Sequence, residues 1–377
     1  MATDLTPAGG RHRAAATPGR APVTTRPGAT GHRLDGLDAA RGLAVLSMLV
    51  AHLSPVGGPL DVSEYLTAPL FVVVIGVATA LRLTRERVDR ARFVADDVLR
   101  GVLLVLLGIV LQATYGQIDV VLPYLGVLVV VLAPLALLLR PLPVLTLGLV
   151  VGGAVLGPLV TERVRDHALA DRSATGAVTA DLLRWLATGP DYRLVSFLPM
   201  ALTGLVLALL LPHLTRLVPT AGVAAVLLGA SGVVKVIGDG TADGAAPYSG
   251  TTAEVVAVTF LAAAAVVASF ALVLLVRGRA MVLEPALRVL LAVGRLALTA
   301  YALQIVVLAL VSLARDGARD DTWPILLGTT AVVVAACWAL DRRFGTGPLE
   351  LLVRAARLPS RSRHGAPVRS PRPAPER

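Results

Sequence analysis

The first apolar segment contains three polar residues whose types and spacing could perform chemistry. Asp38, Arg41 and His52 interrupt the stretch LDGLDAARGLAVLSMLVAH. Arg41 and His52 are eleven positions apart, so a helix would place both on one side with a rise of ~16 Å between them. Asp38 lies three positions before Arg41 and shares that side. An imidazole can take up or release a proton near neutral pH, and a guanidinium can bind anionic oxygen atoms.

The same three residues also have a structural interpretation. Asp38 and Arg41 would form an ion pair at the start of the helix, and His52 would be an interfacial residue at its end. Spacing alone favours this second interpretation. Both are kept here because polar residues inside an apolar helix need a specific reason.

The segment SGTTAEVV offers a second group of candidates. Ser249, Thr251 and Glu254 could bind an acceptor substrate. Thr251 and Glu254 also have the spacing of a capping box that opens a helix, and this interpretation is the favoured one.

The segment GRLALTAYALQ places Arg295, Tyr301 and Gln304 in another apolar run. They could form part of a substrate site, or they could make hydrogen bonds between helices. Arg295 enters from the same side as Arg41, so the two guanidinium groups could bind one anionic ligand. Either side chain could equally extend to the membrane interface.

Several other chemistries find no support in the sequence. It contains no GxxxxGK[ST] phosphate loop, no GxSxG nucleophile elbow and no metal-ligand spacing such as HExxH, so we expect no metal cofactor. Cys337 is the single cysteine, which excludes a disulfide framework within the chain.

Composition shows which elements must position these residues. Of 377 residues, 55% are hydrophobic and only 16% are charged, whereas a soluble domain has roughly 25% charged residues. The net charge is +10, and in so apolar a chain this indicates membrane spans with basic flanks and no nucleic-acid partner. Since strand-type alternation is absent, we expect an all-α polytopic membrane protein. Ten spans are predicted, at 37–53, 65–83, 98–115, 119–139, 141–160, 194–212, 217–238, 253–276, 289–314 and 323–341.

The rest of the chain is predicted to form tails and one surface helix. Residues 1–33 form a disordered basic tail, and residues 34–345 form the membrane domain. Residues 346–358 form an amphipathic interfacial helix, and 359–377 a second disordered tail. Both tails are rich in Arg, whereas the connections 54–64, 113–118 and 239–252 contain no Lys or Arg, so both termini are predicted to be cytoplasmic.

Several segments resemble known membrane families. The pattern LDxxRG followed by His52 is similar to the first helix of type-three membrane acyltransferases. The stretch LDAARGLAVLSMLVAH, followed by YLTAPLFVVVIGVATAL, resembles the catalytic-domain family named for heparan-alpha-glucosaminide N-acetyltransferase. LVSFLPMALTGLVLALL, PYSGTTAEVV, AVGRLALTAYALQ and GTGPLELLVRAAR resemble the related YeiB-like membrane proteins. The heparan acetyltransferases place their functional His in the loop after the first helix. Loop 54–64 has no His, which leaves His52 as the candidate.

The resemblance implies transfer of an acyl group, usually acetyl from cytoplasmic acetyl-CoA or another acyl-CoA, to a hydroxyl or amine of a glycan or lipid outside. His52, Arg41 and Asp38 would then be catalytic, and Arg41 with Arg295 would bind the donor. Acceptor binding would fall to Ser249, Thr251, Glu254, Tyr301 and Gln304. The inner (cytoplasmic) membrane is the expected location. A transporter or flippase of a polar solute or lipid, or a family member without activity, remains an alternative.

Overall fold

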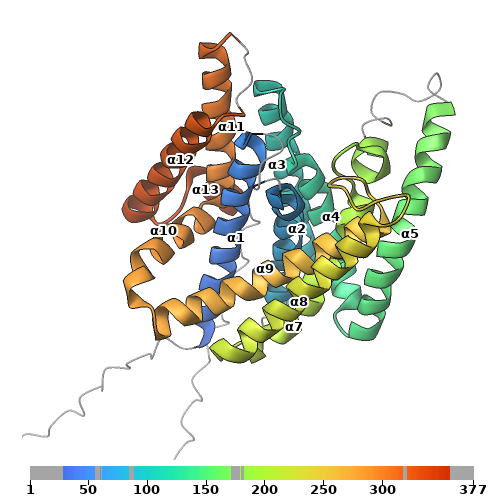
Figure 1. Ribbon diagram of the computed structural model, residues 1–377, viewed down its shortest axis with the longest axis horizontal. Coiled ribbons are helices and arrows are strands. Elements are labelled where there is room, and N and C mark those ends of the chain that lie inside the picture. Colours follow the sequence, from blue (N-terminus) through green and yellow to red (C-terminus); the bar gives the residue numbers. More distant parts are fainter. Residues whose placement is uncertain are drawn as a thin grey trace, which may run out of the picture.

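The chain folds into a bundle of helices with α1 (Ala29–Leu53) and α2 (Val62–Leu83) at its centre (Figure 1). The computed structural model describes residues 29–55, 60, 62–84, 89–170, 179, 182–316 and 321–356. Helix α1 contacts α2, α9, α10, α11 and α12. Small side chains on α1, such as Ala40 and Ala44, have no solvent exposure and let these neighbours approach closely.

The other elements follow in chain order and are all helical within the described residues. They are α3 (Arg90–Thr114), α4 (Leu122–Leu139), α5 (Pro143–Ala170), the π-helix η1 (Arg184–Thr188), α7 (Leu194–Leu210), the 3₁₀ turn η2 (Leu211–His213), α8 (Leu217–Asp239), α9 (Thr252–Gly278), the 3₁₀ turn η3 (Met281–Leu283), α10 (Glu284–Arg295), α11 (Ala297–Ala314), α12 (Trp323–Phe344) and α13 (Pro348–Ala355).

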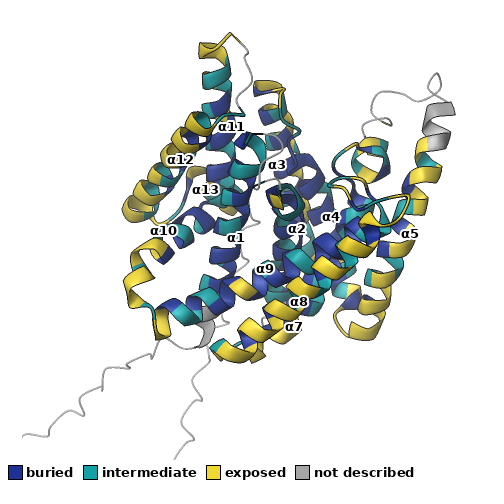
Figure 2. Cartoon of the chain, viewed as in Figure 1, coloured by how far each residue is buried: buried dark blue, intermediate teal, exposed yellow. Residues whose placement is uncertain are grey.

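The prediction of an all-α membrane protein is confirmed. Within the described ranges nine helices are long and apolar enough to cross a membrane, namely α1, α2, α4, α5, α7, α8, α9, α11 and α12. Only 11% of the apolar window of α8 is buried in the protein, against 61% for α1. Figure 2 shows the corresponding exposed surface along α8, which is the surface that lipid would cover.

One of the ten predicted spans, 98–115, falls in α3, which is not among these nine helices. Charged residues occur as far along α3 as Arg100, so only its second half has the apolar character of a span. Helix α3 nevertheless runs antiparallel to α4. Gly101 lies against Gly126, and Gly108 lies against Pro123.

The predicted span 289–314 is wrong in its boundaries. The structure divides it into the short amphipathic α10 and the apolar α11, with a break at Leu296. The break comes directly after the point where α10 crosses α1. The two helices are so close there that a Cβ atom at Gly294 would collide with the backbone oxygen of Asp38.

A helix is present at the C-terminal end of the described chain, as α13, and its Glu350 binds the start of α11. The Glu350 carboxylate accepts hydrogen bonds from the backbone N–H groups of Leu298 (2.8 Å) and Thr299 (3.0 Å). At the other end, α1 begins at Ala29, inside the predicted N-terminal tail. Residues 1–28 and 357–377 lie outside the described residues, so the predicted disorder of the tails stays a prediction.

Candidate functional site

His52 lies in the last turn of α1, where it contacts one residue singled out in another span. Its Nδ1 atom is 3.0 Å from Nε2 of Gln304 on α11. Gln304 has no solvent exposure, and its Oε1 atom has no hydrogen-bond partner among the described residues. The structure therefore brings together His52 and Gln304, which are 252 positions apart in the sequence.

Arg41 and Asp38 form the ion pair that their spacing predicts. Nη1 of Arg41 is 2.6 Å from Oδ1 of Asp38, and the Arg41 side chain is 32% exposed. Helix α1 continues without interruption from this pair to His52. The ion pair and the imidazole thus belong to one rigid element, with an axial rise of ~16 Å between Arg41 and His52.

Arg295 ends α10 and is held by Asp341 of α12. Its Nε atom donates to Oδ1 of Asp341 at 2.8 Å, and a second bond joins Nη2 to Oδ2. The hydrogen bond to Asp341 raises the pKa of Arg295, and the charges of Asp38 and Asp35 add to this increase. Arg295 therefore lies in the electrostatic field of the same Asp38 that pairs with Arg41.

These contacts extend into an ionic cluster that sequence reasoning only partly anticipated. The cluster contains Asp35, Asp38, Arg41, Arg277, Arg295 and Asp341. Arg277 lies 2.6 Å from Asp35, which joins the end of α9 to α1. Three arginines balance three aspartates, so the cluster has no net charge, and an anion bound there would compete with carboxylates that are already in place. The side chains of Arg41 and Arg295 are 32% and 35% exposed, so both guanidinium groups are accessible.

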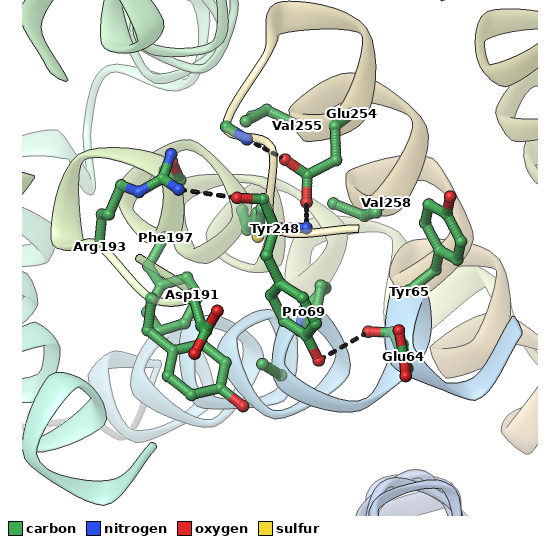
Figure 3. Close-up of a pocket in the computed structure, with 15 residues that line it drawn as sticks. Glu64, Tyr65, Pro69, Asp191, Arg193, Phe197, Tyr248, Glu254, Val255 and Val258 are labelled. Atoms are coloured by element: carbon green, nitrogen blue, oxygen red, sulfur yellow. Dashed lines mark hydrogen bonds between the residues drawn. The ribbon is translucent and has the colours of Figure 1, made fainter. Parts of the chain in front are cut away.

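A separate pocket lies between the starts of α2, α7 and α9 (Figure 3). Its empty volume is about 390 Å³, including its open mouth. The polar and aromatic residues of its lining are Glu64, Tyr65, Asp191, Tyr192, Arg193, Ser196, Phe197, Tyr248 and Glu254. Of the predicted acceptor-binding residues on SGTTAEVV, Glu254 lines this pocket, and Ser249 and Thr251 do not.

The capping interpretation of SGTTAEVV is confirmed, in modified form. The hydroxyl of Thr251 accepts a hydrogen bond from the Glu254 backbone N–H at 3.2 Å and so caps α9. The Glu254 carboxylate reaches further back along the chain, to the backbone N–H groups of Tyr248 (2.7 Å) and Gly250 (2.5 Å). Glu254 therefore shapes the loop before α9 in addition to lining the pocket.

Arg193 holds the same loop from the opposite side, and sequence reasoning missed it. Its side chain is buried, and it donates to the backbone oxygens of Gly189 (2.8 Å), Pro190 (2.7 Å), Tyr248 (2.7 Å) and Ser249 (3.5 Å). Figure 3 shows Arg193 and Glu254 binding either side of the backbone at Tyr248. The charge-balanced connection between α5 and α7 gave no signal that one of its arginines is structural.

Aromatic side chains form the floor of the pocket. Tyr192 packs edge-on against Tyr248, with ring centroids 5.6 Å apart, and against Tyr124 at 5.5 Å. Burial raises the pKa of Tyr192, and the neighbouring Tyr248 raises it further. Burial also raises the pKa of Asp191, and a hydrogen bond with Asp119 adds to this effect.

Tyr301, another predicted acceptor-binding residue, lies in α11. Its hydroxyl accepts a hydrogen bond from the backbone N–H of Val121 at 3.2 Å, and its side chain is buried. It lies one turn before Gln304 on α11. Tyr301 therefore makes a structural hydrogen bond to the backbone before α4, and it is not among the residues that line the pocket.

No three His, Cys, Asp or Glu side chains are grouped closely enough to hold a metal ion anywhere in the described ranges.

A family model described as an acyltransferase domain matches residues 34–342, which extends from α1 into α12. A search of curated proteins gave no significant match. The resemblance of the first helix to type-three acyltransferases is thus confirmed, whereas the likeness to the heparan acetyltransferase and YeiB-like families stays a prediction.

Proposed function

We propose that this chain, which belongs to the type-three acyltransferase family of membrane proteins, passes an acyl group from cytoplasmic acyl-CoA to a hydroxyl or amine of a glycan or lipid on the opposite face of the inner membrane. Acetyl is the first acyl group to test. The observation that supports this most strongly is the layout of α1. One continuous helix has an accessible Arg41–Asp38 pair near the start of its apolar part, Asp35–Leu53, and His52, in contact with buried Gln304, in its last turn.

The spacing on α1 suits a thioester donor. The phosphates of CoA would bind near Arg41 and Arg295, which are both accessible. The extended pantetheine arm is comparable in length to the ~16 Å between Arg41 and His52. The thioester would then lie beside the imidazole.

His52 would act as the general base. Its Nδ1 faces Gln304, so Nε2 is the nitrogen available to the substrate. In the reaction the acceptor O–H or N–H gives its proton to Nε2 while its oxygen or nitrogen attacks the thioester carbonyl carbon. The C–S bond breaks, and the departing CoA thiolate takes the proton back from the imidazolium. General base catalysis of this kind typically contributes 10²–10⁴-fold.

The pocket suits the proposed acceptor class. Carboxylates of Glu64 and Asp191 beside the ring of Tyr248 can accept hydrogen bonds from hydroxyl or ammonium groups and pack against a sugar face. Glu254 would contribute through the loop that it shapes. Ser249 and Thr251 lie on that loop and would bind the outer part of an acceptor.

Proteoliposomes test this function. Purified protein is reconstituted, acetyl-CoA is supplied on one side and an amino sugar or glycolipid on the other, and free CoA is measured. We expect CoA release that depends on the acceptor and an acetylated acceptor on the opposite side. Movement of the solute in the absence of CoA, without acceptor-dependent CoA release, would favour the transporter alternative and reject the proposal.

A further inference from the structure

We propose that Gln304 is a positioning residue that fixes the tautomer of His52. The inference rests on the proposed role of His52 as a base. Within the described residues, the contact with Nδ1 of His52 at 3.0 Å is the one hydrogen bond of the Gln304 side chain, and its other polar atom has none.

Packing does not explain an amide at this position. Gln304 has no solvent exposure, and its neighbours on α11, Ile305 and Leu308, are equally buried and apolar. A buried amide is unfavourable unless its groups are hydrogen-bonded, so an aliphatic residue would serve packing better. The single bond that Gln304 makes goes to the imidazole.

The orientation of the amide decides which nitrogen of His52 carries the proton. With Nε2 of Gln304 toward Nδ1, the amide donates, and the proton of a neutral imidazole must be on Nε2 of His52, where it blocks base catalysis. With the amide turned over, Oε1 accepts from Nδ1–H and the Nε2 atom of His52 is free to take a proton.

The orientation with Oε1 of Gln304 toward Nδ1 is also compatible with the protonated imidazole that forms during the reaction. Once Nε2 of His52 has taken the acceptor's proton, Nδ1 still donates, so only the carbonyl end of Gln304 can face it. The unpaired amide end then offers a buried donor beside the imidazole. Among the described residues, Gln304 is the side chain that is hydrogen-bonded to the His52 ring.

Nitrogen NMR tests the tautomer without any activity. Protein labelled with ¹⁵N-histidine is placed in nanodiscs, and His52 is assigned from the signals lost in His52→Asn. We expect neutral His52 to carry its proton on Nδ1. Gln304→Leu should shift it toward the Nε2–H form, whereas the packing control Ile305→Val should leave it unchanged. A wild-type His52 protonated on Nε2, or a tautomer unaffected by Gln304→Leu, would overturn the proposal.

Kinetics give an independent readout once transfer is measured. Gln304→Leu should lower kcat at least ~10-fold with little change in the KM for acyl-CoA, because the base would be held in the wrong tautomer. Gln304→Glu keeps an acceptor at this position and should move the acid limb of the pH–rate profile to higher pH, since a carboxylate favours the imidazolium. Unchanged profiles in both variants would reject the positioning role. Absence of transfer by the wild type would reject the proposed function instead, and the NMR result would still decide the tautomer.

Discussion

At the scale of single residues, the arginines of the ionic cluster and the imidazole of His52 have different partners. Arg41 is paired with Asp38 at 2.6 Å, and Arg295 with Asp341 at 2.8 Å. His52 instead faces the neutral amide of Gln304. The Arg41–Asp38 pair lies within α1, and the Arg295–Asp341 pair joins α10 to α12. The His52 ring instead joins α1 to α11 through an uncharged partner, which is the environment that the proposed general base requires.

Arg193 allows a sharp test of the loop that forms the pocket. Arg193→Lys retains the charge but loses the planar fork that reaches Gly189, Pro190 and Tyr248, so buried carbonyl groups are left without donors. Each such group costs about 1–3 kcal/mol. We expect a clear fall in the thermal unfolding midpoint, measured by circular dichroism in detergent.

The matched control is Arg184→Lys in the same segment. Arg184 is 49% exposed and lies 3.4 Å from Asp119, and exposed pairs of this kind contribute about 1 kcal/mol or less. Equal losses of stability in the two variants would contradict the role assigned to Arg193.

At the scale of elements, the crossing of α10 and α1 determines where Arg295 lies. Gly42 and Gly294 let the two backbones touch, and the chain breaks at Leu296 directly after this contact. The sequence 289–314 is mostly apolar and contains a single charged residue, Arg295, so hydropathy predicts one span and cannot reveal the break. The deciding feature is a contact with α1, about 250 residues earlier in the chain, and local patterns carry no information about it.

Gly294→Ala tests this crossing. A Cβ atom there would collide with the backbone oxygen of Asp38, and overpacking of this kind costs about 1–3 kcal/mol. We expect a lower unfolding midpoint and a lower affinity for acyl-CoA, because Arg295 would be displaced.

Gly222→Ala on α8 serves as the control, because nothing lies within 4 Å of a Cβ atom at Gly222. Alanine favours a helix over glycine by roughly 0.5–1 kcal/mol, so this variant should be as stable as the wild type or more stable. A Gly294→Ala protein as stable as Gly222→Ala would contradict the close crossing.

At the scale of the whole molecule, the sequence predicted the helical membrane fold and the Arg41–Asp38 pair, because hydropathy and helical spacing are local properties. It also singled out His52 and Gln304, but as separate residues. Three features depend on which helices become neighbours. These are the contact between His52 and Gln304, the Arg295–Asp341 pair, and the hydrogen bonds from Arg193 to the loop before α9. The orientation in the membrane is still a prediction from Arg distribution.

Cysteine labelling tests this orientation. Cys337 is buried and can be replaced by Ala. In that background, Asp243→Cys lies in the connection before α9, and Arg279→Cys lies directly after α9, both at exposed positions. An impermeant maleimide should label position 243 in intact cells, and position 279 only after the membrane is opened. The reverse pattern would place the termini outside and invert the proposed direction of transfer.

The rate of acceptor-dependent CoA release by His52→Ala protein tests the central claim most directly. His213→Ala is the matched control, because His213 is exposed at the end of η2, away from α1. With both variants folded by circular dichroism, we expect His52→Ala to lose about 10²–10⁴-fold in rate and His213→Ala to keep the wild-type rate. Release by His52→Ala at the wild-type rate would contradict the account.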